Sequence, residues 1–330
     1  MKNRIAFVFG AFFFIFIAFL PTDVGANSTE NTYVVQAGDT LPGIAKKFET
    51  SVEELKITNG IQSDLLVVGQ KLWVPTSYEV VAGDTLQNIS SKFHTSPEQI
   101  KTTNKLSAEK VIPGQILKIA PRRMNMQGEH ILMTKEEFKD WLFNQKIKRK
   151  ISLIQQHHTW VPDYGRFNGS NHFGLLTGME NFHKNNMGWK HIAQNITTFP
   201  DGKVAVSRPL HIVPEGTIGS KANSVGIAIE HLGNFDLGHD VMTKEQSDTI
   251  IYVNAALSLK FGLTPSIDSI TYHHWWDLRN GERVLDKGPD YNVKTCPGTG
   301  FFGGNSTTSA TKYFYPLIIR KMEELRKEMD

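Results

Sequence analysis

A gapless internal repeat constrains the fold of this chain more than any other feature. The segment YVVQAGDTL, which begins at Tyr33, recurs as YEVVAGDTL, which begins at Tyr78, at an offset of 45 residues (78 − 33 = 45). Later positions keep the same offset, as Asn59 and Asn104 show. A register that holds over a whole unit indicates two copies of one small folding module.

Each copy carries the signals of a strand, two helices and a second strand. A short apolar segment favours the first strand, and Thr40 can then cap a helix because its hydroxyl can accept a hydrogen bond from a free N–H group. Ser51 and Glu54 form a capping box for the second helix. A Gly-Gln pair turns the chain into the last strand. We therefore predict two βααβ modules, over residues 32–75 and 77–120.

These modules resemble the LysM family through the Gly-Asp-Thr-Leu segment, the asparagine near mid-module and the Gly-Gln pair before the last strand. The resemblance implies binding to glycans that contain N-acetylglucosamine, such as peptidoglycan or chitin. It places the glycan-binding loops after the first strand and after the second helix. The implied residues are Gly38, Asp39, Thr40, Leu41 and Asn59 in the first module, and Gly83, Asp84, Thr85, Leu86 and Asn104 in the second. The same segment is also a helix-capping turn, and both roles are compatible because the turn presents backbone to the sugar.

The first 26 residues have the pattern of a secretory signal peptide. Lys2 and Arg4 precede an apolar run over residues 5–20, and small residues suit cleavage after Ala26. An uncleaved membrane anchor is the alternative, although the run is short for a span of roughly 20 residues. We expect a secreted protein associated with the cell wall, with no stable membrane span after signal cleavage.

The net charge gives little reason to expect a nucleic-acid partner. The formal charge is +3, and removal of Lys2, Arg4 and Asp23 with the signal leaves +3 − 2 + 1 = +2. This near balance, without a long basic block, is not typical of nucleic-acid binding.

The rest of the chain is predicted to be one larger domain behind a linker. Residues 121–134 are polar and irregular, and we interpret them as the linker. Residues 135–330 alternate predicted strands and helices, which indicates an α+β fold with a mixed β-sheet flanked by helices. A capping box at Thr134 and Glu137 begins a helix. We expect this helix to pack on the large domain, and an isolated amphipathic tether is the alternative.

Cys296 is the only cysteine of the chain, and two histidine pairs precede it. A lone thiol in an exported protein cannot form an internal disulfide, but it can bind a metal. Two imidazoles and one thiolate, with a fourth position for water, form a known catalytic zinc set. The pairs begin at His157 and His273, each just past an apolar predicted strand. Spacing alone is weak evidence, since a lone buried cysteine is usually a small apolar residue.

The motifs around these residues resemble the zinc-dependent N-acetylmuramoyl-L-alanine amidases of the type-2 family, which are related to peptidoglycan recognition proteins. They occur in order as HHT at 157–159, GW at 188–189, PDG at 200–202, SVGI at 224–227 and KTCPG at 294–298. The resemblance implies one zinc ion held by His157, His273 and Cys296. His158 and His274 are the alternatives if a strand register shifts by one, because that shift exchanges the faces. The resemblance also implies that Lys294 stabilises an oxyanion.

Two positions depart from that family. Many relatives have a catalytic tyrosine where this chain has Gln194, and others have a glutamate where it has Ala228. Glu230 lies two residues further on the same strand face, so it is the candidate general base for the attacking water. A structural carboxylate that holds a ligand histidine is the alternative. For Trp275 and Trp276, core packing is favoured over a role in the substrate groove.

Together these features predict an exported hydrolase whose partner is peptidoglycan. We expect it to cleave the amide between N-acetylmuramic acid and L-alanine of the stem peptide, while the LysM modules hold it on glycan strands. Two alternatives remain open, a non-catalytic recognition protein and a zinc endopeptidase that cuts within the stem peptide. The sequence has no His-Glu-x-x-His motif, which disfavours the common metallopeptidase type.

Overall fold

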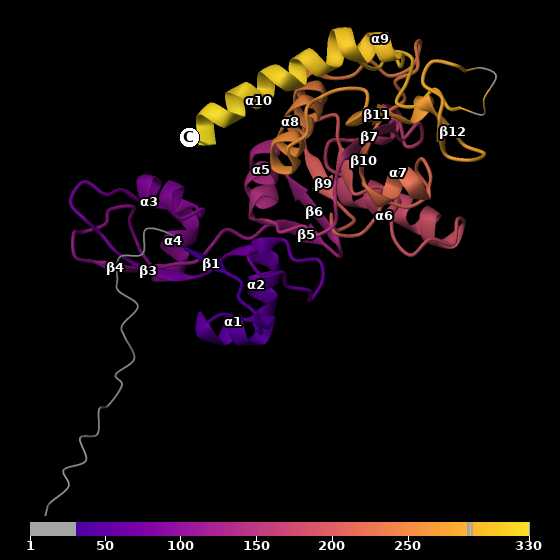
Figure 1. The fold of residues 1–330 in the computed structure, drawn as a ribbon. Helices are drawn as coiled ribbons and strands as arrows, with labels where there is room; N and C mark the ends of the chain where they lie inside the picture. Colours follow the sequence, from indigo (N-terminus) through magenta and orange to yellow (C-terminus); the bar gives the residue numbers. More distant parts are fainter. Residues whose placement is uncertain (1–30, 289–290, 292, 330) are drawn as a thin grey trace, which may run out of the picture.

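The computed structural model describes residues 31–288, 291 and 293–329, so the predicted signal peptide lies outside the described residues. Two small modules precede one larger domain of strands and helices (Figure 1). Within the described ranges, no helix combines the length and the apolar character that crossing a membrane requires.

Both N-terminal modules have the predicted βααβ arrangement. The first consists of β1 (Thr32–Val34), α1 (Leu41–Lys47), α2 (Val52–Asn59) and β2 (Lys71–Trp73). The second consists of β3 (Thr76–Glu79), α3 (Leu86–Lys92), α4 (Pro97–Asn104) and β4 (Ile116–Ile119). In each module the first and last strands pair antiparallel, so the two ends of each repeat close the unit.

The same repeat positions cap the helices and fill the cores of both modules. The Thr40 hydroxyl accepts a hydrogen bond from the backbone N–H of Gly43, and Thr85 caps α3 in the same way. Ser51 and Ser96 cap the second helices. Four buried apolar positions recur in the cores of both modules: Leu41, Ile44, Leu55 and Leu72 in the first, and Leu86, Ile89, Ile100 and Leu117 in the second.

The interpretation of residues 121–134 as a linker is wrong from residue 125 onward. β5 (Asn125–Gln127) and β6 (His130–Met133) form a hairpin that belongs to the sheet of the large domain. β6 pairs with β9 (Val204–Val206), and all four residues of β6 are buried. Three adjacent apolar residues are too short a signal to predict a strand alone, and only pairing with β9 turns them into core.

The large domain is built on a seven-stranded mixed sheet, as predicted, with the order β11-β7-β10-β8-β9-β6-β5. Four adjacent strands of this sheet are parallel to one another: β7 (Leu153–His158), β8 (Ile196–Thr198), β10 (Gly226–His231) and β11 (Ile270–Tyr272). β9, β6 and β5 continue the sheet in antiparallel pairs.

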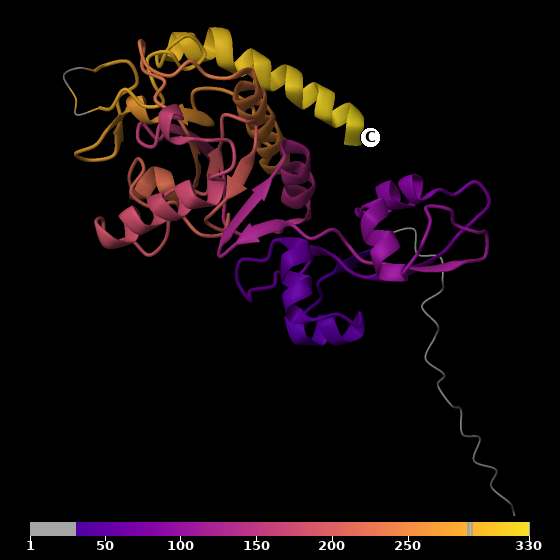
Figure 2. The same cartoon turned by 180° about the vertical axis from the view of Figure 1, so that it is seen from behind.

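Helices cover both faces of this sheet (Figures 1 and 2). On one face lie α5 (Lys135–Asn144), α8 (Lys244–Phe261) and α10 (Tyr315–Met329), which share one apolar core with the strands. On the other face lie α6 (His172–Asn185), which packs over Leu132 and Ala205, and α7 (Ser220–Ser224), which packs over Leu153.

Local capping sets the limits of two long helices of the large domain. Thr134 and Glu137 cap α5, which packs on the large domain as expected. Thr243 caps α8, and Gly262 ends it in the left-handed conformation. The remaining short elements are η1 (Tyr164–Arg166), η2 (His273–Trp275), β12 (Trp276–Asp277), β13 (Glu282–Arg283), η3 (Phe301–Gly303), α9 (Thr307–Ser309) and η4 (Ala310–Phe314).

The placement of β6 in the core leads to a stability prediction. Met133→Ala removes a buried side chain of the main core, so the large domain should lose about 2–5 kcal/mol of unfolding free energy. Urea unfolding followed by tryptophan fluorescence measures this loss. Gln127→Ala, at an exposed position of the same hairpin, is the matched control and should change stability by less than about 0.5 kcal/mol. Equal, small effects of both substitutions would restore the linker interpretation.

Candidate metal centre and active-site cleft

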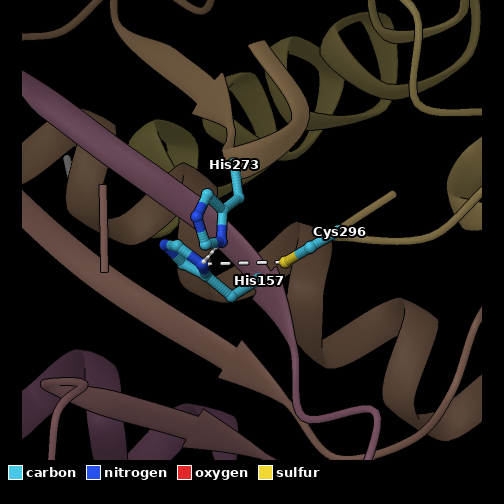
Figure 3. Close-up of side chains that lie close together, drawn as sticks. All are labelled: His157, His273 and Cys296. Carbon is cyan, nitrogen blue, oxygen red and sulfur yellow. Dashed lines mark hydrogen bonds between the residues drawn. The ribbon is translucent and has the colours of Figure 1, made fainter. Parts of the chain in front are cut away.

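Three donor side chains that are distant in sequence meet at the carboxyl ends of the parallel strands. His157 lies at the end of β7, and His273 follows β11 directly. β11 pairs in parallel with β7, so both histidines emerge at the same edge of the sheet. Cys296 comes from the C-terminal loop and completes the group (Figure 3). The carboxyl edge of such a sheet is the usual place for a ligand site.

Two donor–donor distances in this group fit a single tetrahedral ion. The Nδ1 atoms of His157 and His273 lie 3.1 Å apart, and the Cys296 Sγ lies 3.7 Å from the His157 Nδ1. All three donor atoms lie within 4.8 Å of one another, and all three residues are buried. Tetrahedral coordination with ordinary metal–nitrogen and metal–sulfur distances separates two nitrogens by about 3.3 Å and nitrogen from sulfur by about 3.6 Å.

The electrostatics of this group also suit metal binding. Burial lowers the pKa of His157 well below its usual range and that of His273 to about 3, so both imidazoles are neutral at pH 7. Neutral imidazole is the form that binds a metal. Burial raises the pKa of the Cys296 thiol well above its usual range, and the nearby Glu230 adds to this shift. A divalent cation acts in the opposite sense, because positive charge favours the thiolate.

The neighbouring histidines, which the sequence left open as ligands, have other partners. The His158 Nδ1 accepts a hydrogen bond from the Phe235 N–H at 3.1 Å, and burial lowers the pKa of His158 to about 4. The His274 Nδ1 lies 2.6 Å from the carbonyl oxygen of Lys294, which can only accept, so this nitrogen donates. The strand register therefore turns His157 and His273, rather than their neighbours, toward Cys296.

A clamp on the C-terminal loop fixes the position of the thiol. The Thr295 hydroxyl donates to one carboxylate oxygen of Asp236 at 2.9 Å, and the Thr299 N–H donates to the other at 3.0 Å. Gly298, at φ +118°, lies so close to Phe235 that a Cβ would come within 2.5 Å of its backbone. The His158 N–H donates to the Cys296 Sγ at 3.3 Å. Sequence reasoning missed Asp236, because nothing local links it to a loop some sixty residues later.

Glu230 and Lys294 line the same cleft as the three donor residues. This cleft has a volume of about 1030 Å³. Glu230 in β10 lies directly across the ladder from His157 in β7. Its Oε2 is buried and has no hydrogen-bond partner within the described part of the chain, and burial raises the pKa of Glu230 to about 8 against the opposing effect of Lys294. An unpartnered carboxyl group of this kind can hold or accept a proton near neutral pH.

The two positions that depart from the family pattern supply no titratable group. Gln194 lines the cleft, and its Nε2 donates to the Thr197 hydroxyl at 3.0 Å. Ala228 is fully buried in β10. Glu230 is therefore the acidic side chain that the structure brings beside the donor group.

The aromatic residues that face the cleft differ from those singled out in the sequence. Trp275 is fully buried and its indole N–H donates to the Asn305 carbonyl, whereas the Trp276 indole donates to Thr271, so both pack as core residues as favoured. Trp160 lines the cleft instead and is 61% exposed. Its φ of +58° is uncommon for a large side chain, and such conformations concentrate at functional sites. A single tryptophan after the His-His-Thr motif gave no signal of this orientation.

Four of the residues expected to meet a glycan have structural roles instead. Leu41 and Leu86 are buried in the module cores, which their spacing in the helices dictates. The Asn59 amide bridges α2 to β2 by bonds of 2.6 and 2.9 Å to the backbone of Trp73. The Asn104 amide does the same in the second module at 2.7 Å. These side chains shape the loops and do not reach out of them.

The other six residues lie at the loop surfaces. Asp39 accepts hydrogen bonds from the Tyr33 hydroxyl and the Gln36 N–H, and Asp84 closes the second loop in the same way. The exposed members of the two loops are Gly38, Thr40, Gly83 and Thr85.

Comparison with known families divides the chain into the same parts. Residues 33–75 and 78–120 match the model of the LysM domain, and residues 147–299 match the model of the N-acetylmuramoyl-L-alanine amidase family. The cell wall-binding protein YocH of Bacillus subtilis is 45% identical over 47 residues, which is 14% of this chain and 16% of that protein. An autolysin of Enterococcus faecalis is 46% identical over 57 residues, 16% of this chain and 8% of that protein. The chain thus spans less than a fifth of the length of these curated relatives.

Solved structures resemble the larger part of the chain at low identity. The N-acetylmuramoyl-L-alanine amidase LysC from Clostridium intestinale is 19% identical with a TM-score of 0.35, over 53% of this chain and 87% of that one. Drosophila PGRP-LB is 16% identical with a TM-score of 0.39, over 52% of this chain and 85% of that one.

The donor geometry leads to a prediction about metal content. His157→Ala or Cys296→Ser removes one of three buried donors. The purified protein should then hold about tenfold less bound divalent metal, as expected when a ligand is lost. Inductively coupled plasma mass spectrometry measures the metal per chain. His158→Ala is the control for strand register and should retain the metal. Loss of metal from His158→Ala with retention in His157→Ala would reverse the ligand assignment.

Proposed function

The chain joins two LysM domains to a domain of the N-acetylmuramoyl-L-alanine amidase family, and we propose that it is an exported, zinc-dependent amidase of the bacterial cell wall. The reaction is hydrolysis of the amide between N-acetylmuramic acid and L-alanine of peptidoglycan. One observation carries this proposal: His157, His273 and Cys296 converge in a single cleft that Glu230 and Lys294 also line.

Zinc is the ion that the donor set suits best. Two imidazole nitrogens and a thiolate match its ligand preferences, and three protein ligands leave a fourth position free, as catalytic zinc sites do. When bound, zinc acidifies water and polarises a carbonyl oxygen. The clamp formed by Asp236 would support the ion indirectly, because it holds the loop that carries Cys296.

Two residues of the cleft transfer the proton and stabilise the negative charge that develops in the reaction. Glu230 accepts the proton of the attacking water, since its Oε2 has no hydrogen-bond partner within the described residues and it lies across from His157. The same carboxyl group can then return a proton to the leaving amine. Lys294 brings positive charge to the cleft, where it stabilises the oxyanion that forms on the scissile carbonyl.

The lining of the cleft suits a muropeptide. Its volume of about 1030 Å³ lies at the upper end of ordinary ligand pockets. Among the described residues, Arg166 and Lys294 line it together with a single acidic residue, Glu230, so the cleft attracts a substrate that carries carboxylates, as stem peptides do. Exposed Trp160 and Phe182 offer apolar surface for a sugar or a peptide side chain.

A recognition protein without catalysis is the second candidate. Gln194 favours it, because this cleft residue cannot transfer a proton. The complete donor set and Glu230 favour the hydrolase. The two functions separate in the digestion experiment below, because only a hydrolase releases peptides from the wall.

Digestion of purified peptidoglycan tests the reaction. Mass spectrometry should show stem peptides with a free L-alanine amino group and glycan strands with free lactyl carboxyl groups, and a zinc chelator should abolish both. Lys294→Met should lower kcat by about 10²–10³-fold, the usual cost of losing an oxyanion partner. Lys287→Met, at an exposed lysine in the same region of the chain, is the matched control and should keep full activity. Products cut inside the stem peptide would identify an endopeptidase instead.

Exposure of Trp160 leads to a separate prediction about substrate binding. Trp160→Ala removes a ring from the rim of the cleft without touching the donor group, so KM should rise about tenfold, the equivalent of roughly 1.4 kcal/mol, while kcat changes little. Steady-state kinetics with a soluble muropeptide measures both constants. Trp276→Phe, in the core, is the control. An unchanged KM in Trp160→Ala would show that the ring does not contact the substrate.

A further inference from the structure

We propose that the two LysM modules have different tasks: the first is a docking module fixed on the amidase domain, and the second is the module that holds the glycan. The docking half of this inference rests on contacts within the chain. The glycan half rests on the proposed wall anchoring. The repeat itself supplies an internal comparison, because each position of one module has a counterpart 45 residues away (78 − 33 = 45).

The residues that end the second helices differ because of packing and not because of backbone conformation. α2 ends at Gly60 with φ 57° and ψ 43°, and α4 ends at Lys105 with φ 53° and ψ 40°. Since a lysine adopts this left-handed conformation in the second module, the conformation alone does not explain the glycine in the first. A Cβ at Gly60 would lie 2.8 Å from both the Met124 Sδ and the Trp141 Nε1. The glycine therefore permits close approach of the segments that lead into and belong to the large domain.

Hydrogen bonds follow the same contact. The Gln62 Nε2 donates to the Glu129 carbonyl at 2.6 Å and to the Val206 carbonyl at 3.2 Å, so it joins the first module to the β5–β6 turn and to β9. The Met124 N–H donates to the Ile57 carbonyl at 3.2 Å. In both views α2 lies beside this hairpin (Figures 1 and 2).

Burial separates the two modules at equivalent positions. Residues 58–61 of the first module are all buried, whereas none of residues 103–106 of the second is buried. Trp73 is also buried, but it packs against the His94 ring of the second module and does not report on docking to the large domain. The second module reaches α5 elsewhere, where the His94 ring lies 3.8 Å from the Asp140 carboxylate. Docking through the end of the second helix is thus a property of the first module.

Docking restricts access to one of the two loops through which a LysM module can bind a glycan. In the first module, the loop between α2 and β2 lines a groove shared with Gln145, Lys146 and His211 of the large domain. A Cβ at Gly69 of this loop would lie 4.0 Å from the Lys146 Cε. At the equivalent Gly114 of the second module, no atom lies within 4 Å of that position among the described residues. Only the second module keeps both loops open.

The side chains that differ between the modules fit this division. Gly60, Leu65 and Trp73 of the first module are replaced in the second by Lys105, Lys110 and Lys118, all of which are exposed. Three exposed lysines suit an anionic wall surface. Of the first-module residues, Gly60 permits the close approach of the large domain, whereas Leu65 is exposed and Trp73 packs against the His94 ring of the second module.

Hydrogen exchange of the full chain tests the docking. Gly60→Lys introduces the residue of the second module where α2 ends against the large domain. We expect hydrogen exchange in the β5–β6 hairpin to rise at least tenfold, because the contact between the first module and the hairpin is lost. Lys105→Gly is the mirrored control and should leave exchange in the hairpin unchanged. Gln62→Ser also introduces the residue of the second module but leaves the end of α2 intact. If Gly60→Lys unfolds the first module, Gln62→Ser tests the docking by itself and should give a smaller rise in hydrogen exchange of the hairpin. Wild-type exchange in both first-module variants would overturn the docking.

Glycan binding tests the second half with a matched pair of loop variants. Gly38 and Gly83 occupy equivalent loops at φ +87° and +91°, with no atom within 4 Å of a Cβ among the described residues, so valine strains either loop equally. Calorimetry with an N-acetylglucosamine hexamer should show at least tenfold weaker binding for Gly83→Val and wild-type binding for Gly38→Val. Equal weakening by both variants would overturn the division of tasks. No binding by the wild-type chain would refute glycan anchoring itself, while the exchange experiment would still decide the docking.

Discussion

The pairing of β7 with β11 is the constraint on which the candidate active site depends. Parallel register brings the ends of these strands to one edge of the sheet, and His157 and His273 lie there with facing Nδ1 atoms. Cys296 reaches the same point from a loop held by Asp236 and by the close approach of Gly298 to Phe235. No local segment contains two of these three donors, so the centre exists only when the large domain is folded.

The same constraint places the other chemical groups of the cleft. β10 pairs with β7, and this pairing puts Glu230 across from His157. Low solvent exposure then gives this carboxyl group a pKa of about 8 and leaves one of its oxygens without a partner among the described residues. Lys294 enters the cleft because it is tied in sequence to Cys296, so one loop delivers both the thiol and a positive charge.

The two modules share one fold and one set of core residues, and they differ in the residues on their surfaces. The main apolar positions of their cores correspond, from Leu41 and Leu86 to Leu72 and Leu117. Their outer faces diverge where the first module meets the large domain, at Gly60 against Lys105. A repeat can therefore keep the core residues that determine its fold while its surface binds a different partner, because the core and the docking face use different side chains.

Local physical chemistry was enough to predict the features that depend on neighbours in sequence. The repeat predicted both βααβ modules, and the capping box at Thr134 and Glu137 predicted the start of α5. Residue types and motifs also named His157, His273 and Cys296. Tertiary contacts alone decided the rest: which histidine of each pair faces the thiol, that residues 130–133 are a core strand, and that Trp160 rather than Trp275 faces the cleft. These outcomes depend on pairing and burial between segments far apart in sequence, and short patterns carry no record of such contacts.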